Sequence, residues 1–234
     1  MTRRLLARYR RAWRTRVMDP GDPVSLRLRR RAVVIGTLLV GAGVNAWALR
    51  IPAGDPKFYF ATGVLAAVWF GGAFGSGPIR IGHEPYRRGV RPVASSLLFS
   101  AVLVGVFCTG AVLVAPVDAL REPVLELLAH AQAENLLAIA LLTAINGVAE
   151  ECFHRGAVYS AVHRWRPVLT TTAVYAAVVA TAGIPLLVVA ALALGLVTGL
   201  QRRSTGGVLG PIFTHVTWSM AMLFALGPIL RHFA

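Results

Sequence analysis

One long apolar segment of this chain ends in the stretch Asn146-Gly-Val-Ala-Glu-Glu-Cys-Phe-His-Arg-Gly156, which holds two adjacent glutamates. Ionisable residues at membrane depth are expensive, so they are usually paired, face the protein interior and serve a function. On a helix, Glu150 lies one turn before His154, and Glu151 lies one turn before Arg155. This spacing predicts that one pair supplies acid–base chemistry while the other anchors the helix. The alternative is a carboxylate pair that only caps the helix end beside Arg155.

The composition around this stretch is that of a membrane protein. Mean hydropathy is +0.64, and of the 234 residues 56% are hydrophobic and 15% are charged. This balance excludes an ordinary soluble domain and indicates a polytopic helical protein with short loops. We therefore expect an all-α membrane bundle of about seven transmembrane helices. The apolar runs that predict these helices are 32–49, 58–75, 93–115, 135–153, 168–182, 184–200 and 207–227.

The basic residues are concentrated ahead of the first apolar run. The net charge is +14, and eleven arginines fall between Arg3 and Arg31. We expect residues 1–31 to form a basic arm with an amphipathic interfacial helix, and residues 32–234 to form the transmembrane domain. The arm would contact anionic lipid headgroups. Nucleic acid is not an expected partner, because the sequence has no polar domain that interleaves basic and aromatic residues.

Basic loops alternate with acidic or nearly neutral ones along the chain. The arm and the loops 76–92, 155–166 and 201–207 carry arginines, so the positive-inside rule predicts that they are cytoplasmic. Residues 116–134 are mixed apolar and acidic, which favours a helix along the outer face. Usage rich in Ala, Arg, Gly and Val and poor in Lys favours a bacterial plasma membrane. This topology places the two glutamates and His215 at the same depth, where they can face one another.

Two spaced elements carry a family resemblance. Glu150-Glu-x-x-x-Arg155-Gly, followed much later by Gly210-Pro-x-x-x-His215-x-x-x-Ser, resembles the CPBP family of intramembrane proteases, which includes the CAAX prenyl protease 2 type enzymes. The resemblance covers residues 130–230. It implies a helical bundle around a conical cavity that opens toward the cytoplasm, and an endopeptidase of the glutamate type. The implied substrate is a membrane-associated or lipid-modified polypeptide.

The resemblance also implies a role for each matching residue. Glu150 would be the general base that activates a water, Glu151 an assisting carboxylate and Arg155 its anchor. His215 and Ser219 would stabilise the oxyanion. These roles agree with general chemistry, because a carboxylate shielded from bulk water is a stronger base. A fixed hydrogen-bond donor in a low-dielectric site also stabilises developing charge strongly.

The sequence departs from the family pattern at three places. Ser219 stands where the last motif usually has asparagine. The middle motif, Phe-x-x-x-His, is matched best by Tyr175-Ala-Ala-Val-Val179, which lacks the histidine. His154 stands where the first motif usually has phenylalanine. Our hypothesis is that His154, one turn beyond Glu150, partly replaces the absent histidine.

Other functions remain open at this point. The lost histidine favours a catalytically weak or inactive family member that acts as a membrane scaffold or chaperone. Intramembrane carboxylates also occur in proton-coupled transporters, although the chain shows no internal repeat typical of those proteins. We expect no cofactor. The alternative is a bound metal ion, because Glu151-x-x-His154 is a spacing by which one helix supplies two ligands, with Glu150 and His215 as further candidates. The sequence does not predict the oligomeric state.

Overall fold

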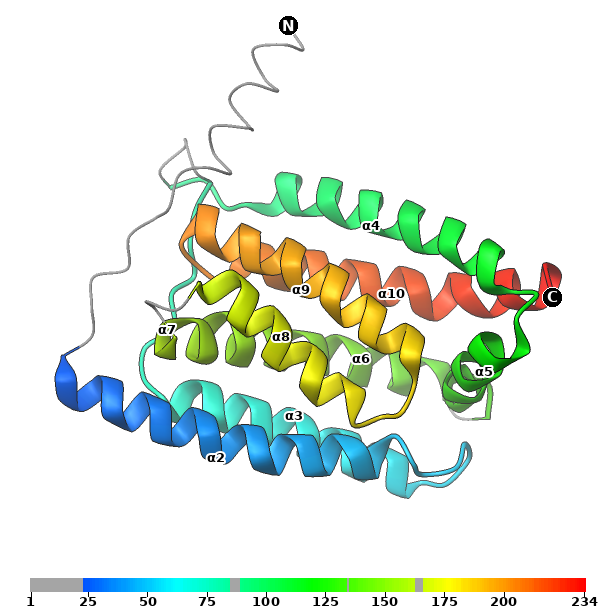
Figure 1. The fold of residues 1–234 in the computed structure, drawn as a ribbon, viewed down its shortest axis with the longest axis horizontal. Helices are drawn as coiled ribbons and strands as arrows, with labels where there is room; N and C mark the ends of the chain where they lie inside the picture. The colour runs from blue at the N-terminus through cyan, green and yellow to red at the C-terminus, as the bar shows by residue number, and fades with distance from the viewer. Residues whose placement is uncertain (1–22, 85–88, 134, 163–165) are drawn as a thin grey trace, which may run out of the picture.

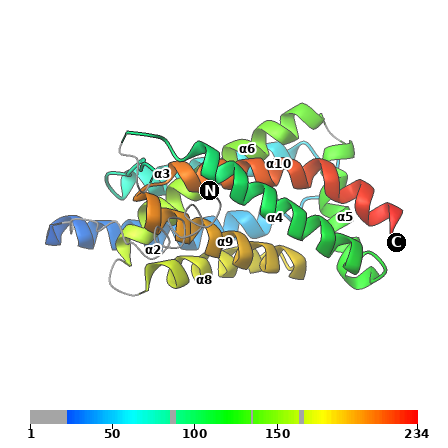
Figure 2. The same ribbon diagram turned by 90° about the horizontal axis from the view of Figure 1, so that it is seen from above.

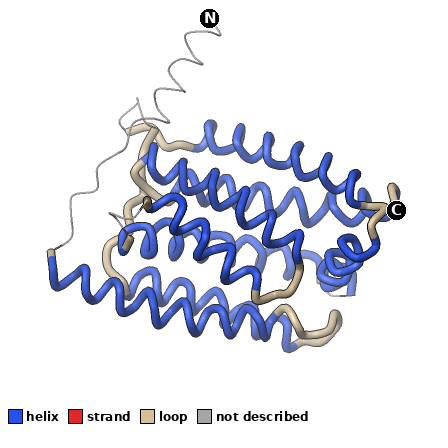
Figure 3. The backbone as a smooth tube through the Cα atoms, viewed as in Figure 1, coloured by secondary structure: helices blue, strands red, loops and turns tan. Residues whose placement is uncertain are grey.

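The computed structural model describes residues 23–84, 89–133, 135–162 and 166–234, and these ranges contain helices and no strand (Figures 1 and 3). The helices are α2 (Val24–Ala48), α3 (Lys57–Gly75), α4 (Val93–Val114), α5 (Asp118–Ala133), α6 (Leu136–Glu151), the π-helix η1 (Cys152–Val158), α7 (Tyr159–Ala161), α8 (Pro167–Ala180), α9 (Pro185–Thr205) and α10 (Leu209–His232). The all-α fold is confirmed.

Six segments of the described chain are long and apolar enough to cross a membrane, counting 136–161 as one, and α8 is a shorter apolar helix of 14 residues. Together they correspond to the seven predicted apolar runs. Proline is the first residue of both α8 and α9. The N–H at this position has no partner within a helix, so proline, which lacks it, is well tolerated there. Gly206 ends α9 at φ 74°, in the left-handed conformation that favours glycine.

These helices run alternately up and down the bundle, and α5 lies across one end of it (Figures 1 and 2). This end also holds the connections α2–α3 and α8–α9 and the C-terminus, and it is called the α5 end below. The connections that carry the basic loops, α3–α4, α7–α8 and α9–α10, meet at the other end, called the basic end. The predicted alternation of loops is therefore present in the fold.

The basic arm was predicted to reach residue 31, but α2 begins at Val24. The arginines at 27–31 thus belong to the first two turns of α2 instead of a separate arm. One of them, Arg30, is only 2% exposed. The interfacial helix expected earlier in the arm lies in residues 1–22, outside the described residues.

A segment that we call the strap, residues 76–84, closes the basic end. It hydrogen-bonds to the α9–α10 turn, from the Val208 N–H to the Arg80 carbonyl (2.9 Å) and from the Leu209 N–H to the Ile81 carbonyl (3.0 Å). Arg30 donates to the Ser76 hydroxyl (3.3 Å) and to the Pro78 carbonyl (3.4 Å). These bonds satisfy backbone groups that a membrane-facing segment would otherwise leave unpaired.

Candidate active site

The glutamate stretch lies where an α-helix widens into a π-helix. Glu151 is the last residue of α6, and η1 begins at Cys152. Single π-helical turns occur frequently at functional sites. The wider turn moves His154 off the stripe that an α-helix would share with the Glu150 side chain. Its ring Nδ1 instead lies 3.0 Å from the Glu150 backbone carbonyl.

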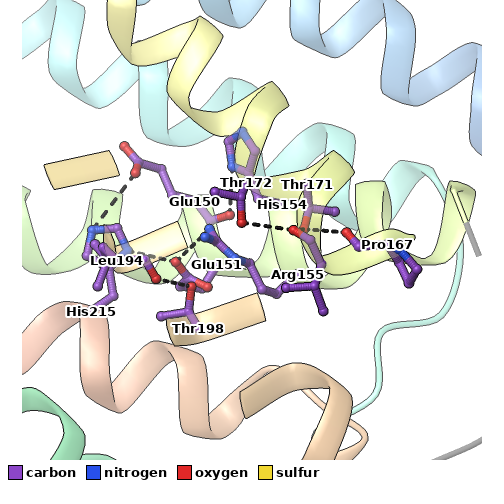
Figure 4. Close-up of polar contacts among 11 residues, drawn as sticks. Glu150, Glu151, His154, Arg155, Pro167, Thr171, Thr172, Leu194, Thr198 and His215 are labelled. Carbon is purple, nitrogen blue, oxygen red and sulfur yellow. Dashed lines mark hydrogen bonds and ion pairs between the residues drawn. The ribbon is translucent and has the colours of Figure 1, made fainter. Parts of the chain in front are cut away.

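Glu151 forms a sealed ionic cluster. Its side chain and that of Arg155 are both fully buried, and Arg155 Nη1 donates to Glu151 Oε1 at 2.9 Å. His215 Nδ1, from α10, lies 2.9 Å from the same oxygen (Figure 4). Because the carboxylate accepts, the ring nitrogen carries the proton there. The predicted i to i+4 anchor between Glu151 and Arg155 is present.

Glu150 is placed differently from its neighbour. Its side chain is 19% exposed, and its Oε2 lies 4.0 Å from His215 Nε2, on the far side of the imidazole from Glu151 (Figure 4). This separation exceeds a direct hydrogen bond but fits one bridging water. The structure thus brings the predicted base and the predicted imidazole together, with the second glutamate behind the ring.

Two connections set the position of His215. The preceding residue, Thr214, accepts a hydrogen bond from Gln201 of α9 (2.8 Å) and donates to the Ser96 carbonyl of α4 (3.1 Å). On the α6 side, a Cβ on Gly147 would lie 3.7 Å from the His215 ring and 3.3 Å from Val216. The glycine therefore allows α6 and α10 to approach closely where the imidazole meets the carboxylates.

A cavity of about 320 Å³ lies in front of Glu150 and His215. Tyr175, Asn146 and Ser219 also line it, and most of its remaining wall is apolar. The predicted oxyanion residue Ser219 therefore faces the same space as Glu150. Asn146 donates to the Thr62 carbonyl (3.2 Å) and the Leu142 carbonyl (3.0 Å), so its side chain connects α6 to α3.

The cavity runs from Glu150 toward the α5 end. Its far wall is built by the end of α2, by α5 and by the beginning of α9, including Leu49, Leu127 and His130. The same three residues line a second cavity of about 510 Å³, which also contacts Arg50 and Glu126. Among the described residues, the strap covers the basic end and packs Ile79 against Gly156 of η1. That the cavity opens toward the cytoplasm stays a prediction.

His154 does not reach the cavity wall. It is fully buried, and its ring lies between those of Trp69 (centroids 5.3 Å apart) and Tyr175 (4.9 Å). Among the sequence-predicted site residues, the structure brings together Glu150, Glu151, Arg155, His215 and Ser219 and leaves His154 behind them.

Two residues of the site were missed in the sequence. Tyr175 was considered only as the first position of the middle motif, yet it lines the cavity beside Glu150. Arg202 was assigned to a basic loop, but it is 3% exposed and its Nε donates to the Arg155 carbonyl at 2.8 Å. For Tyr175 the sequence does hold a signal. A tyrosine in an apolar helix needs a hydrogen-bond partner for its hydroxyl, which indicates a polar neighbour inside the bundle.

The described residues contain no group of three or more His, Cys, Asp or Glu side chains arranged to hold a metal ion. In this part of the chain His154 is turned away from Glu150 and His215, so the metal set considered from the sequence does not converge. Whether the protein uses a cofactor stays a prediction.

The geometry can be set against known families. Residues 132–221 match the family model described as type II CAAX prenyl endopeptidase Rce1-like. The match confirms the resemblance found in the sequence, and the segment contains all six predicted site residues. No curated protein and no solved structure matches the chain. The Rce1-like match and the six apolar helices of the described chain indicate an integral membrane protein.

Proposed function

We propose that this protein is an intramembrane endopeptidase in which Glu150 activates a water molecule for attack on a peptide bond. The observation that carries the proposal is that two adjacent glutamate side chains have different surroundings. Glu151 is sealed against Arg155 and His215, whereas Glu150 faces the cavity, 4.0 Å from the other nitrogen of the same imidazole. A general base must reach both water and substrate, and Glu150 meets that requirement.

The chemistry follows from this arrangement. The Glu150 carboxylate takes a proton from water, and the resulting hydroxide attacks the peptide carbonyl carbon. When the His215 ring is protonated, Nδ1–H donates to Glu151 and Nε2–H points toward Glu150 and the cavity, where it stabilises the oxyanion. Glu150 then returns its proton to the departing amine as the C–N bond breaks. Arg155 holds the Glu151 carboxylate in place behind the ring.

We further propose that the substrate is a membrane-associated polypeptide that reaches Glu150 from the α5 end. The mostly apolar cavity wall favours a substrate segment that enters from the lipid phase or carries a hydrocarbon group. We propose that the basic end faces the cytoplasm of a bacterial plasma membrane, because its arginines follow the positive-inside pattern.

The test is cleavage of a fluorophore–quencher peptide with one apolar span, with and without a farnesyl group, by the protein purified in detergent. We expect Glu150→Gln to lower kcat at least about 100-fold, since an amide cannot accept the proton. The matched control is Glu122→Gln, on the exposed surface of α5. Equal cleavage by Glu150→Gln and the unsubstituted protein would refute the proposal.

The same variants separate the competing functions. An inactive scaffold would cleave neither peptide, with or without the substitution. A proton-coupled transporter in liposomes would show a pH-driven flux that Glu150→Gln abolishes. No observation in the described residues favours transport, because the strap covers the basic end behind the glutamates.

A further inference from the structure

Tyr175 is a buried phenol at the first position of the middle motif, where the family pattern has phenylalanine and no hydroxyl. It belongs to α8, is 6% exposed and lines the cavity together with Glu150 and His215. Its ring centroid lies 6.2 Å from that of His215, the imidazole that faces Glu150. Buried tyrosine hydroxyls normally have a hydrogen-bond partner, and Glu150 is the carboxylate that shares the cavity with Tyr175.

The Tyr175 ring is held from three directions. The Arg155 guanidinium carbon lies 4.9 Å from the ring centroid, in a cation–π contact. The His154 ring packs edge-on at 4.9 Å, and the His215 ring at 6.2 Å. These contacts fix the plane of the phenol, so the direction of its hydroxyl is also fixed.

Glu150 needs such a partner more than Glu151 does. Glu151 already has Arg155 and His215 at 2.9 Å, whereas the Glu150 carboxylate lies 4.0 Å from His215 Nε2. A base that faces a cavity must be held in one rotamer, because each misaligned rotamer reduces the population that is ready to react. A fixed phenol beside the carboxylate meets this need.

We infer that Tyr175 is a positioning residue, whose hydroxyl donates to Glu150 and holds that carboxylate in the cavity opposite His215. This inference rests on the proposed function, in which Glu150 is the base, but the contact itself is measurable without any peptidase activity. The charged and titratable groups around Glu150 are His215 from α10, Tyr175 from α8, and Glu151, His154 and Arg155 from its own helical segment.

The chain offers a close control. Tyr159 is also 6% exposed, and its ring lies 4.8 Å from the guanidinium carbon of Arg202, as that of Tyr175 does from Arg155. It does not line the cavity. Tyr175→Phe and Tyr159→Phe thus each remove one phenol hydroxyl beneath a buried arginine, and only the first removes a contact with Glu150.

The experiment is an infrared pH titration of the protein in lipid, in which the carboxyl C=O band of Glu150 is assigned by subtracting the Glu150→Gln spectrum. In Tyr175→Phe we expect protonation of Glu150 to move up by about one pH unit, because one hydrogen bond to the charged form is lost. We also expect its C=O band to rise in frequency. Tyr159→Phe should leave both unchanged. An unchanged midpoint and band in Tyr175→Phe would overturn the inference.

Kinetics on the same peptide provide a second measurement. We expect Tyr175→Phe to lower kcat about ten-fold with KM within about two-fold, and to move the acid limb of the pH–rate profile in the same direction as the infrared midpoint. A merely structural role would change thermal stability and leave that limb in place, which would contradict the inference. Full activity of Glu150→Gln would instead refute the proposed function while leaving the infrared result intact.

Discussion

The two ends of the helical bundle are built in opposite ways. At the basic end the strap is hydrogen-bonded to the α9–α10 turn, and Arg30 and Arg202 are buried with carbonyl partners. At the α5 end two cavities share Leu49, Leu127 and His130. The two regions meet at the glutamate pair, where Glu151 is buried against Arg155 and His215 and Glu150 lines the cavity. One carboxylate therefore stabilises the structure while its neighbour remains available for chemistry.

The largest effect should come from breaking the sealed cluster. Arg155→Met leaves Glu151 buried without its arginine, and we expect the free energy of unfolding to fall by about 3–5 kcal/mol. The measurement is unfolding by sodium dodecyl sulfate in mixed micelles, followed by circular dichroism. Lys57→Met is the control, because it removes an exposed ion pair with Asp55 (3.8 Å) and should have little effect. Equal losses in the two variants would contradict the distinction between the ends.

A smaller loss should follow from disturbing the strap. A Cβ on Gly207 would overlap the Ile81 backbone, so Gly207→Ala should destabilise the protein by about 1–3 kcal/mol in the same assay. Gly36→Ala in α2 meets no atom within 4 Å and should be neutral or slightly stabilising. If Gly207→Ala is also neutral, the strap is not held as tightly as its hydrogen bonds indicate.

Access from the α5 end can be blocked at the shared wall. Leu127→Trp adds bulk where the two cavities meet, and we expect kcat/KM on the reporter peptide to fall about ten-fold with little change in stability. Leu113→Trp serves as the control, because Leu113 lies on α4 and is 74% exposed. Unchanged kcat/KM for Leu127→Trp would show that substrate enters elsewhere.

The smallest effect is expected at His154. Its ring is enclosed by Trp69 and Tyr175 and lies off the cavity, so we expect His154→Phe to keep kcat within about two-fold. The measurement is peptide cleavage alongside Tyr175→Phe. A loss larger than that of Tyr175→Phe, at unchanged stability, would restore the hypothesis that His154 replaces the absent middle-motif histidine.

Much of the site was predictable because its signals are local in the sequence. The i to i+4 spacing of Glu151 and Arg155 is enough to predict their ion pair, and the alternation of apolar runs and basic loops is enough to place His215 near them. The role of Tyr175 was not predictable in this way. Its relation to Glu150 depends on how α8 packs against α6 and η1, and no pattern within α8 reports that packing.

The amino-acid sequence by itself determined an all-helical membrane bundle, the grouping of its basic loops at one end, and the set of acidic, basic and imidazole groups at the site. Hydropathy and charge decide these properties over short stretches, so they can be predicted without coordinates. Only the tertiary structure decided which of two neighbouring glutamates faces the cavity, and at which end that cavity lies. The first depends on His215 of α10, which contacts Glu151 on one side and faces Glu150 on the other. The second depends on the strap, whose partners at 205–209 are more than a hundred residues away in the chain.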